Sequence, residues 1–182
     1  FFRPLEKIAA VIETYPRGIA GFRNYLDLLN TSPGIEDAPD AQSAPALRGE
    51  IAFVGVHFAY DPARPILSGI DLTVRAGETV AFVGASGAGK TTLLALLPRF
   101  YDPQAGRITI DGLPLAAMTL ESLRRQIGLV SQDVFLFGGT LRENIAYGRL
   151  GASEAEVQEA AARAQLGPLI ASLPEGLETV VG

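Results

Sequence analysis

The segment GASGAGKT, residues 84–91, matches the pattern GxxxxGKT, and the interpretation of the whole chain depends on it. An apolar run at residues 79–83 precedes it and is typical of a buried strand, whereas residues 92–97, TLLALL, favour a helix after it. Glycine residues let the backbone come close to a diphosphate, and the N–H groups at the start of the helix can point at it. The sequence therefore predicts a phosphate-binding loop between a strand and a helix.

Two side chains of this segment have a predicted role of their own. Lys90 would reach the β- and γ-phosphates, and the Thr91 hydroxyl would ligate Mg²⁺. The alternative is a glycine-rich turn with an incidental lysine. The chain has 20 Gly but its Lys residues are Lys7 and Lys90 alone, so a chance match at all four fixed positions is rare. We therefore favour the phosphate loop.

The composition limits the other classes of function. With 182 residues, of which 48% are hydrophobic, the chain can bury the core of one domain with an appendage. The net charge is −5 and the Arg residues are scattered, which argues against a nucleic-acid surface. The absence of Cys excludes disulfides and thiol chemistry. No apolar run approaches the roughly 18 residues that span a bilayer.

The first fifty residues divide into a helical part and a linker. Residues 1–30 are predicted to be mostly helical, and we expect them to pack on a support outside the domain because short amphipathic helices are unstable alone. Their two apolar stripes consist of Leu5, Ile8, Val11 and Ile12, and of Phe22, Leu26 and Leu29. Residues 31–49 contain three Pro and no apolar period, which predicts a semi-extended, solvated linker. Because the sequence starts with Phe1, we expect a piece of a longer chain.

Alternating patterns from residue 50 predict short antiparallel strands joined by tight turns. One strand would place Val54, Val56, Phe58 and Tyr60 on a single face, and the next would do so for Ile70, Leu72 and Val74. Residues 106–112 alternate and end in an Asp-Gly turn signal. The apolar residues 79–83 and 127–130 instead predict buried strands of a parallel sheet, so two layers are expected. Gln132 would then follow the end of a parallel strand.

Helix signals dominate the rest of the chain. Thr119 is a predicted N-cap for a helix through Arg125, and residues 140–143 and 153–156 both fit the capping box. The second capping box would begin a helix that Gly167-Pro168 ends. The sequence thus predicts a small helical lobe; the apolar stripe of its longest helix consists of Val157, Ala160, Ala161 and Ala164.

The order of these landmarks resembles the nucleotide-binding domain of an ATP-binding cassette (ABC) transporter of the exporter type. The resemblance extends continuously from Gly49 over about 130 residues. The segments that carry it are ILSGIDLTVRAGETVAFVGASGAGKTTL (66–93), GRITIDG (106–112), LVSQDVFLFGGTLRENIAYG (129–148) and LPEGLETVVG (173–182).

This resemblance implies an α/β fold, in which a P-loop NTPase-type parallel sheet carries an antiparallel β subdomain and a partial helical subdomain. Residues 1–30 would be the helical extension from the membrane domain and residues 31–49 the linker. Residues 50–182 would be the nucleotide-binding domain, truncated before the family's signature motif. The expected cofactors are ATP and Mg²⁺. The expected partners are the transmembrane domain of the same transporter and a second nucleotide-binding domain, at the cytoplasmic face of a cell membrane, with the bacterial inner membrane preferred.

The resemblance also assigns roles to individual residues. Tyr60 corresponds to the aromatic residue that stacks on adenine, although an ordinary core-facing strand residue is the alternative. Gln132 corresponds to the glutamine that contacts Mg²⁺ or the attacking water, so Lys90 and Gln132 are the implied catalytic residues and Thr91 and Gln132 the implied metal ligands. The implied ATP contacts are Tyr60, Ile66, Gly84, Ala85, Ser86, Gly87, Ala88, Gly89, Lys90, Thr91 and Thr92.

Several motifs of the family do not occur in these residues. They are the LSGGQ signature, the apolar strand that ends in Asp-Glu, and the switch histidine. His57 lies upstream of the loop, and we interpret it as a partly exposed strand residue. Phosphoryl transfer depends on positioning and charge stabilisation, so we expect these residues alone to bind ATP with little or no turnover.

Two other classes of protein share a phosphate loop. The first is a different phosphate-loop enzyme, either a GTPase or a small-molecule kinase. A GTPase would need DxxG and NKxD motifs, and none of the Asp or Asn residues lies in either. A non-catalytic nucleotide-binding or scaffold module also fits the loop. A signature motif encoded after Gly182 would separate this module from a transport ATPase.

Overall fold

The computed structural model describes residue 15, residues 18–133 and residues 135–182. The first predicted apolar stripe, from Leu5 to Ile12, lies outside the described residues. Residues 18–29 are helical, and Phe22 and Leu29 of the second stripe are 60% and 63% exposed. The support predicted for this helix therefore remains a prediction. No helix among the described residues has the length and apolar character needed to cross a membrane.

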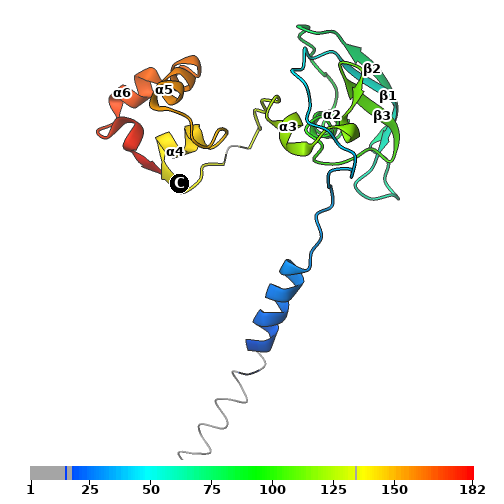
Figure 1. Cartoon of the computed structure of the whole chain (residues 1–182), viewed down its shortest axis with the longest axis horizontal. Coiled ribbons are helices and arrows are strands. Elements are labelled where there is room, and N and C mark those ends of the chain that lie inside the picture. Colours follow the sequence, from blue (N-terminus) through cyan, green and yellow to red (C-terminus); the bar gives the residue numbers. More distant parts are fainter. Residues whose placement is uncertain (1–14, 16–17, 134) are drawn as a thin grey trace, which may run out of the picture. The chain divides into compact units, whose positions relative to one another are not determined.

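The chain forms two compact units, up to Gly128 and from Leu129 onward. The first unit contains a four-stranded antiparallel sheet in the order β2-β1-β3-β4 (Figure 1). Its strands are β1 (Ile51–Phe58), β2 (Leu67–Val74), β3 (Ala105–Ile110) and β4 (Leu113–Pro114). Its helices are α2 (Lys90–Ala95), the 3₁₀ turn η1 (Leu115–Ala117) and α3 (Leu120–Arg124). The predicted antiparallel strands and the helix after residue 89 are confirmed.

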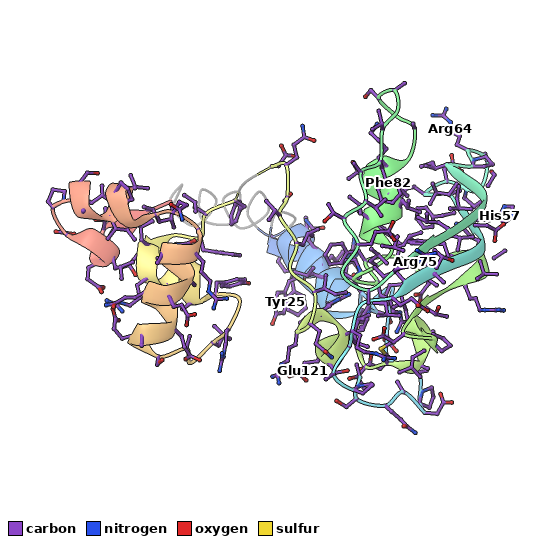
Figure 2. The ribbon with its side chains drawn as sticks, turned by 90° about the horizontal axis from the view of Figure 1, so that it is seen from above. Tyr25, His57, Arg64, Arg75, Phe82 and Glu121 are labelled. Carbon is purple, nitrogen blue, oxygen red and sulfur yellow. The ribbon has the colours of Figure 1, made fainter. Side chains whose placement is uncertain are left out.

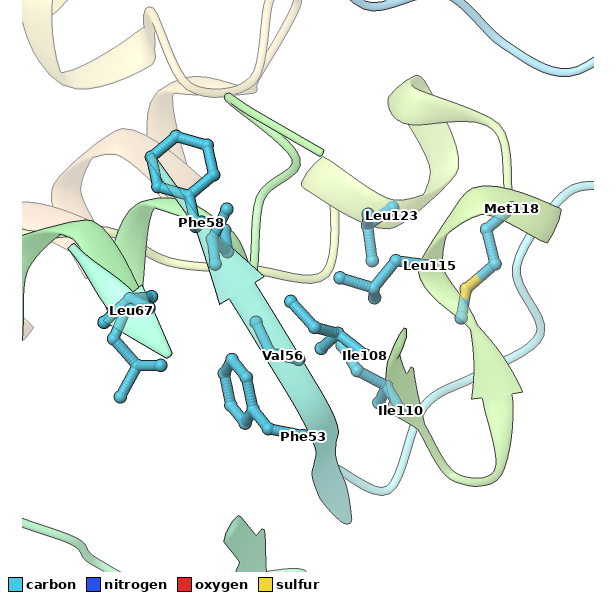
Figure 3. Close-up of a cluster of buried hydrophobic side chains, with 11 residues drawn as sticks. Phe53, Val56, Phe58, Leu67, Ile108, Ile110, Leu115, Met118 and Leu123 are labelled. Atoms are coloured by element: carbon cyan, nitrogen blue, oxygen red, sulfur yellow. The ribbon is translucent and has the colours of Figure 1, made fainter. Parts of the chain in front are cut away.

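One apolar core joins the sheet of the first unit to its helices (Figure 3). Val56 of β1, Leu96 after α2 and Leu123 of α3 are fully buried at its centre. Burying a side chain of this size contributes about 1.5–3 kcal/mol of transfer free energy. The other members of the cluster are Phe53, Phe58, Leu67, Leu93, Ile108, Ile110, Leu115 and Met118.

The predicted face of β1 is right for Val56 and Phe58, which are buried, but wrong for Val54, because the strand contains a β-bulge. Phe53 and Val56 are buried whereas Val54 is 39% exposed, and the pairing with both neighbouring strands shifts register between residues 53 and 57. Gly55 in the bulge has φ +57°, a conformation that glycine adopts without strain. The extra residue reverses the alternation, so Phe53 faces the core in place of Val54. The predicted face of β2 is confirmed by half-buried Ile70, Leu72 and Val74.

The Asp-Gly signal after β3 is also confirmed. Asp111 and Gly112 have φ values of +52° and +79°, as a two-residue turn of type I′ requires, and they connect β3 to β4. The Asp111 carboxylate accepts hydrogen bonds from the backbone N–H groups of Arg48, Gly49 and Glu50 at 2.5, 3.3 and 3.0 Å. These contacts fasten the start of β1 to the end of β3.

The parallel sheet predicted around the phosphate loop is not seen in the described residues. Neither residues 79–83 nor residues 127–130 form a strand, and Val83 and Val130 are 95% and 97% exposed. A parallel strand needs hydrogen-bonding neighbours, and no described segment pairs with either run. Phe82 (Figure 2) nevertheless packs against the core, and so does Ile127. The observed fold is thus mixed α/β with an antiparallel sheet.

The predicted linker is extended, but its second half is attached to the first unit. The N–H of Ala44 donates to Ser122 Oγ at 2.8 Å, and the N–H of Leu47 donates to Gln126 Oε1 at 2.9 Å. Gln126 Nε2 donates in return to the Pro45 carbonyl at 2.9 Å. Since the partner residues lie about eighty positions away along the chain, the composition of the linker did not predict this attachment.

The second unit is the predicted helical lobe. It contains β5 (Gly139–Thr140), α4 (Leu141–Ala146), α5 (Glu154–Arg163), α6 (Gly167–Ser172), the 3₁₀ turn η2 (Gly176–Glu178) and β6 (Val180–Val181), with β5 and β6 antiparallel. Both predicted capping boxes are present, at Thr140 with Glu143 and at Ser153 with Glu156. Arg142 forms ion pairs with Glu154 and with Glu178, which connects α4 to α5 and η2.

Two details of this lobe differ from the prediction. Val157 and Ala161 are buried, but Ala160 and Ala164 are exposed, so the stripe on α5 is narrower than predicted. The helix ends at Arg163. The N–H groups of Gln165 and Leu166 close it by donating to the carbonyl oxygens of Ala162 and Ala161, and Gln165 has φ +60° in this arrangement. Gly167-Pro168 therefore begins α6 instead of ending α5, because proline fits the first turn of a helix.

Candidate functional site

The segment at residues 84–89 forms a loop that leads directly into α2 at Lys90. Gly87 and Gly89 have φ values of +80° and +82°, which side chains rarely permit. A Cβ atom on Gly89 would lie 2.8 Å from Leu67 Cδ2 and 3.1 Å from Ile66 Cγ2. Glycine at position 89 is therefore favoured by the backbone conformation, and an added Cβ would in addition force the Leu67 and Ile66 side chains to shift.

Lys90 holds its ammonium group against this loop. Its Nζ atom donates hydrogen bonds to the carbonyl oxygens of Gly84 and Ala85 at 2.8 and 2.7 Å. An ammonium group has three donors, so one N–H remains for another acceptor. The positive charge of Lys90 is therefore held beside the carbonyl oxygens of the loop.

The first turn of α2 adds backbone donors to this charge. Its N-cap residue, Gly89, provides no side chain to accept from them, and the first N–H groups of any helix lack partners within the helix. The N–H groups of Lys90, Thr91 and Thr92 occupy these positions. Together with the Lys90 ammonium they form an arrangement suited to the oxygens of a phosphate chain.

An aromatic cluster lies beside the loop, at the end of β1. The ring centroid of Tyr60 is 5.0 Å from those of Phe58 and Tyr101, with interplanar angles of 90° and 79°. The Tyr60 hydroxyl lies 3.3 Å from Thr92 Oγ1 in α2. Tyr60 is 54% exposed, so it is not the core-facing aromatic residue of the alternative interpretation. Because about half of Tyr60 remains accessible, a planar group can still reach it.

The first unit thus brings together most of the residues that the sequence singled out. Ile66 lies beside Gly89 of the loop, Thr92 follows the loop directly, and Tyr60 reaches Thr92. Gln132 belongs to the second unit, where it is exposed and lies in an irregular segment, and its role remains a prediction. His57 is an exposed residue of β1, as predicted (Figure 2).

Sequence reasoning did not identify Tyr101 as a neighbour of Tyr60. The signal available in the sequence was an aromatic residue a few positions after the helix, which has no characteristic spacing from the loop. The side-chain contact depends on the return of the chain from α2 into β3, and it joins residues 41 positions apart (101 − 60).

The chemistry of the site includes oxygen ligands for a metal. Thr91 is exposed at the start of α2, and its hydroxyl is a hard oxygen donor of the kind that Mg²⁺ accepts. The described residues contain no group of three or more His, Cys, Asp or Glu side chains that could hold an ion. A metal bound here would thus use the Thr91 hydroxyl and oxygens of its phosphate ligand, and Gln132 remains a predicted further ligand.

Comparisons with known proteins agree with the resemblance found in the sequence. The family model described as ABC transporter matches residues 67–177. An uncharacterized ABC transporter ATP-binding protein, YwjA of Bacillus subtilis (strain 168), is 57% identical over 181 residues, which cover 100% of this chain and 32% of that protein. An ATP-dependent lipid A-core flippase of Syntrophus aciditrophicus (strain SB) is 47% identical over 100% of this chain and 30% of its own.

A solved structure described as a bacterial Atm1-family ABC exporter with ATP bound matches with a TM-score of 0.82 and 46% identity. The match covers 100% of this chain and 32% of that one. This chain therefore spans about a third of the length of the relatives it matches.

Proposed function

Since this chain belongs to the ABC transporter family, we propose that it is the ATP-binding part of an exporter that couples ATP hydrolysis to transport across a membrane. The observation that carries the proposal is the loop at residues 84–91, with the Lys90 ammonium fixed on two of its carbonyls and Tyr60 adjoining it through Thr92. The similarity to an exporter with ATP bound supports the same assignment.

Each group of this site has a defined task towards ATP. The N–H groups of the loop and of the first turn of α2 bind the phosphate oxygens, and Lys90 reaches the β- and γ-phosphates. Tyr60 stacks on adenine, and Ile66 adds apolar contact beside it. The phosphate-binding residues are Gly84, Ala85, Ser86, Gly87, Ala88, Gly89, Lys90, Thr91 and Thr92.

Thr91 and Gln132 are the residues that would hold Mg²⁺. The bound ion supplies charge stabilisation to the phosphate oxygens. Gln132 in addition orients the attacking water, and its predicted position after a strand would connect the site to the transmembrane domain. The exposed oxygen donor of Thr91 fits this role by its chemistry.

The finer domain organisation is part of the same proposal. Residues 1–30 extend from a transmembrane domain, residues 31–49 form the linker, and residues 50–182 belong to the nucleotide-binding domain. Residues 79–83 and 127–130 form parallel strands where neighbouring strands pair with them, and the packing of Phe82 and Ile127 on the core supports this. The partners are the transmembrane domain and a second nucleotide-binding domain, arranged head to tail at the cytoplasmic face of the membrane.

The residues present here favour binding of ATP over its turnover. The loop, Lys90, Thr91 and Gln132 can hold MgATP, but the signature motif and the acidic strand that act on the transition state do not occur among the 182 residues. Interactions made equally with the ground state and the transition state raise affinity without raising the rate of the chemical step. We therefore expect slow phosphate release from the 182-residue segment and fast release from the full-length protein.

Phosphate release tests the proposal, with Lys90→Ala as the control for contaminating ATPase. Release by the full-length protein that Lys90→Ala abolishes is the expected result. Nucleotide binding without release by the full-length protein would instead support a non-catalytic module. Fast release by the 182-residue segment, abolished by Lys90→Ala, would show that other residues carry the chemistry.

A further inference from the structure

The backbone next to Tyr60 is held by one side chain from a distant part of the sequence. Gln104 Nε2 donates to the carbonyl oxygen of Ala59 at 2.6 Å, and the N–H of Ala59 donates to Gln104 Oε1 at 2.8 Å. The N–H of Gln104 also donates to the carbonyl of His57 at 3.0 Å. The backbone bond continues the β1–β3 ladder to Gln104, and the two side-chain bonds add one further rung at Ala59.

The ring of Tyr60 is held by a second residue of the same segment. Tyr101 meets it edge to face, with the centroids 5.0 Å apart, and also lies 5.5 Å from the ring of Phe58. The three rings contact one another in pairs, so two neighbouring rings hold the orientation of Tyr60, and the residue as a whole stays 54% exposed. Such edge-to-face pairs contribute beyond the apolar area that they bury.

The segment that supplies both residues is itself rigid. Arg99 is buried, and its Nε and Nη2 atoms donate to the two carboxylate oxygens of Asp102 at 2.9 Å each. Arg124 of α3 donates to the carbonyl oxygens of Pro98 and Arg99 at 2.8 and 2.9 Å. The start of the turn between α2 and β3 is therefore fastened to α3, and the Arg99–Asp102 pair spans Tyr101.

We propose that Tyr101 and Gln104 are positioning residues that preorganise the Tyr60 ring for the base of a bound nucleotide. The proposal rests on the proposed stacking role of Tyr60. Fixing a side chain before binding removes the cost of ordering it when the ligand arrives. Neither residue contacts the loop at residues 84–91 in the described interactions, so their influence is confined to the base end of the nucleotide.

Two ligands separate this positioning role from a general structural one. ATP has a base and a phosphate chain, whereas inorganic triphosphate has the chain alone. In the full-length protein, Gln104→Ala and Tyr101→Ala should each weaken Mg-dependent ATP binding by about three- to tenfold, a part of the effect of a lost base stack, and should leave the affinity for inorganic triphosphate unchanged. Tyr101→Phe, which keeps the ring, should restore the affinity lost in Tyr101→Ala.

The Tyr60→Ala background completes the test. If Gln104 acts through Tyr60, adding Gln104→Ala to Tyr60→Ala should cause no further loss of ATP affinity. An equal loss for ATP and triphosphate, or a full additional loss in the Tyr60→Ala background, would overturn the proposal. Unchanged ATP affinity in Gln104→Ala and Tyr101→Ala, with weakened binding in Tyr60→Ala, would overturn the positioning role alone. Unchanged affinity in Tyr60→Ala would overturn the stacking role on which it rests.

Discussion

The hydroxyl oxygens of Tyr60 and Thr92 lie 3.3 Å apart, which joins the aromatic cluster after β1 to the first turn of α2. This separation is long for a hydrogen bond between two hydroxyl groups, so the contact adds little energy. The ring contacts with Phe58 and Tyr101 are closer to their preferred geometry. The position of Tyr60 therefore depends on its ring more than on its hydroxyl.

The first prediction concerns this ring. Tyr60→Ala should weaken ATP binding by about 1–3 kcal/mol, by analogy with bases that stack on aromatic side chains. Tyr60→Phe should retain most of the affinity, because it keeps the ring and loses only the long contact with Thr92. Titration with a fluorescent ATP analogue measures both. If Phe were as damaging as Ala, the stacking role would have to be given up.

The second prediction concerns Lys90. Lys90→Ala should abolish or severely weaken Mg-nucleotide binding, because it deletes the one cation that the loop holds against the carbonyls of Gly84 and Ala85. Arg107→Ala is a matched control, since it removes one positive charge from an exposed position of β3. Equal affinities in the wild type and Lys90→Ala would contradict the assignment of the phosphate loop.

The features that the sequence predicted correctly are local. The two capping boxes and the Asp111-Gly112 turn each depend on residues at most three positions apart, so a short pattern contains the whole interaction. The loop at residues 84–89 and the helix α2 that follows it are also features that a short stretch of sequence predicts. The bulge at Gly55 was missed because its register depends on β2 and β3, which no single strand pattern encodes.

The interactions that sequence reasoning missed connect distant positions. Gln104 pairs with the backbone of Ala59 across 45 positions, and the Asp111 carboxylate binds N–H groups 61 to 63 positions away. The predicted parallel strands are not seen in the described residues for a related reason, because a strand forms only where neighbouring strands hydrogen-bond to it. For the candidate site, the loop and the helix that follows it could thus be predicted and the roles of the individual residues remain predictions, whereas the residues that hold Tyr60 could not be predicted.

The third prediction concerns acid stability. Hydrogen bonds from the backbone N–H groups of Glu50 and Arg48 hold the pKa of the Asp111 carboxyl below its ordinary value. A carboxyl whose pKa is lower in the folded state stabilises the fold above its unfolded pKa of about 3.9, and this stabilisation is lost as the pH falls through the folded pKa. The stability difference between the wild type and Asp111→Asn should therefore shrink in acid.

Urea denaturation midpoints between about pH 3 and pH 7 measure this difference. Asn tolerates the positive φ of position 111, so the variant tests the carboxylate and leaves the turn intact. Asp40→Asn is the matched control, because Asp40 is an exposed carboxylate of the linker at residues 31–49 and lies outside this turn. A difference for Asp111→Asn that stays constant over the whole pH range would contradict the role of its ionised form.

The last prediction concerns the close approach of β1 and β3 at the bulge. A Cβ atom on Gly106 would lie 2.5 Å from the carbonyl carbon of Gly55 and from the carbonyl oxygen of Val54. Backbone atoms cannot move aside as a flexible side chain can, so Gly106→Ala should destabilise the fold by about 2 kcal/mol or more. Gly77→Ala separates the two causes, because Gly77 has a similar φ of +77° against +81° but has no atom within 4 Å of an added Cβ. The positive φ alone should cost about 1 kcal/mol there, and urea denaturation of both variants measures the excess at Gly106. Equal destabilisation of the two variants would mean that the bulge does not bring the strands this close.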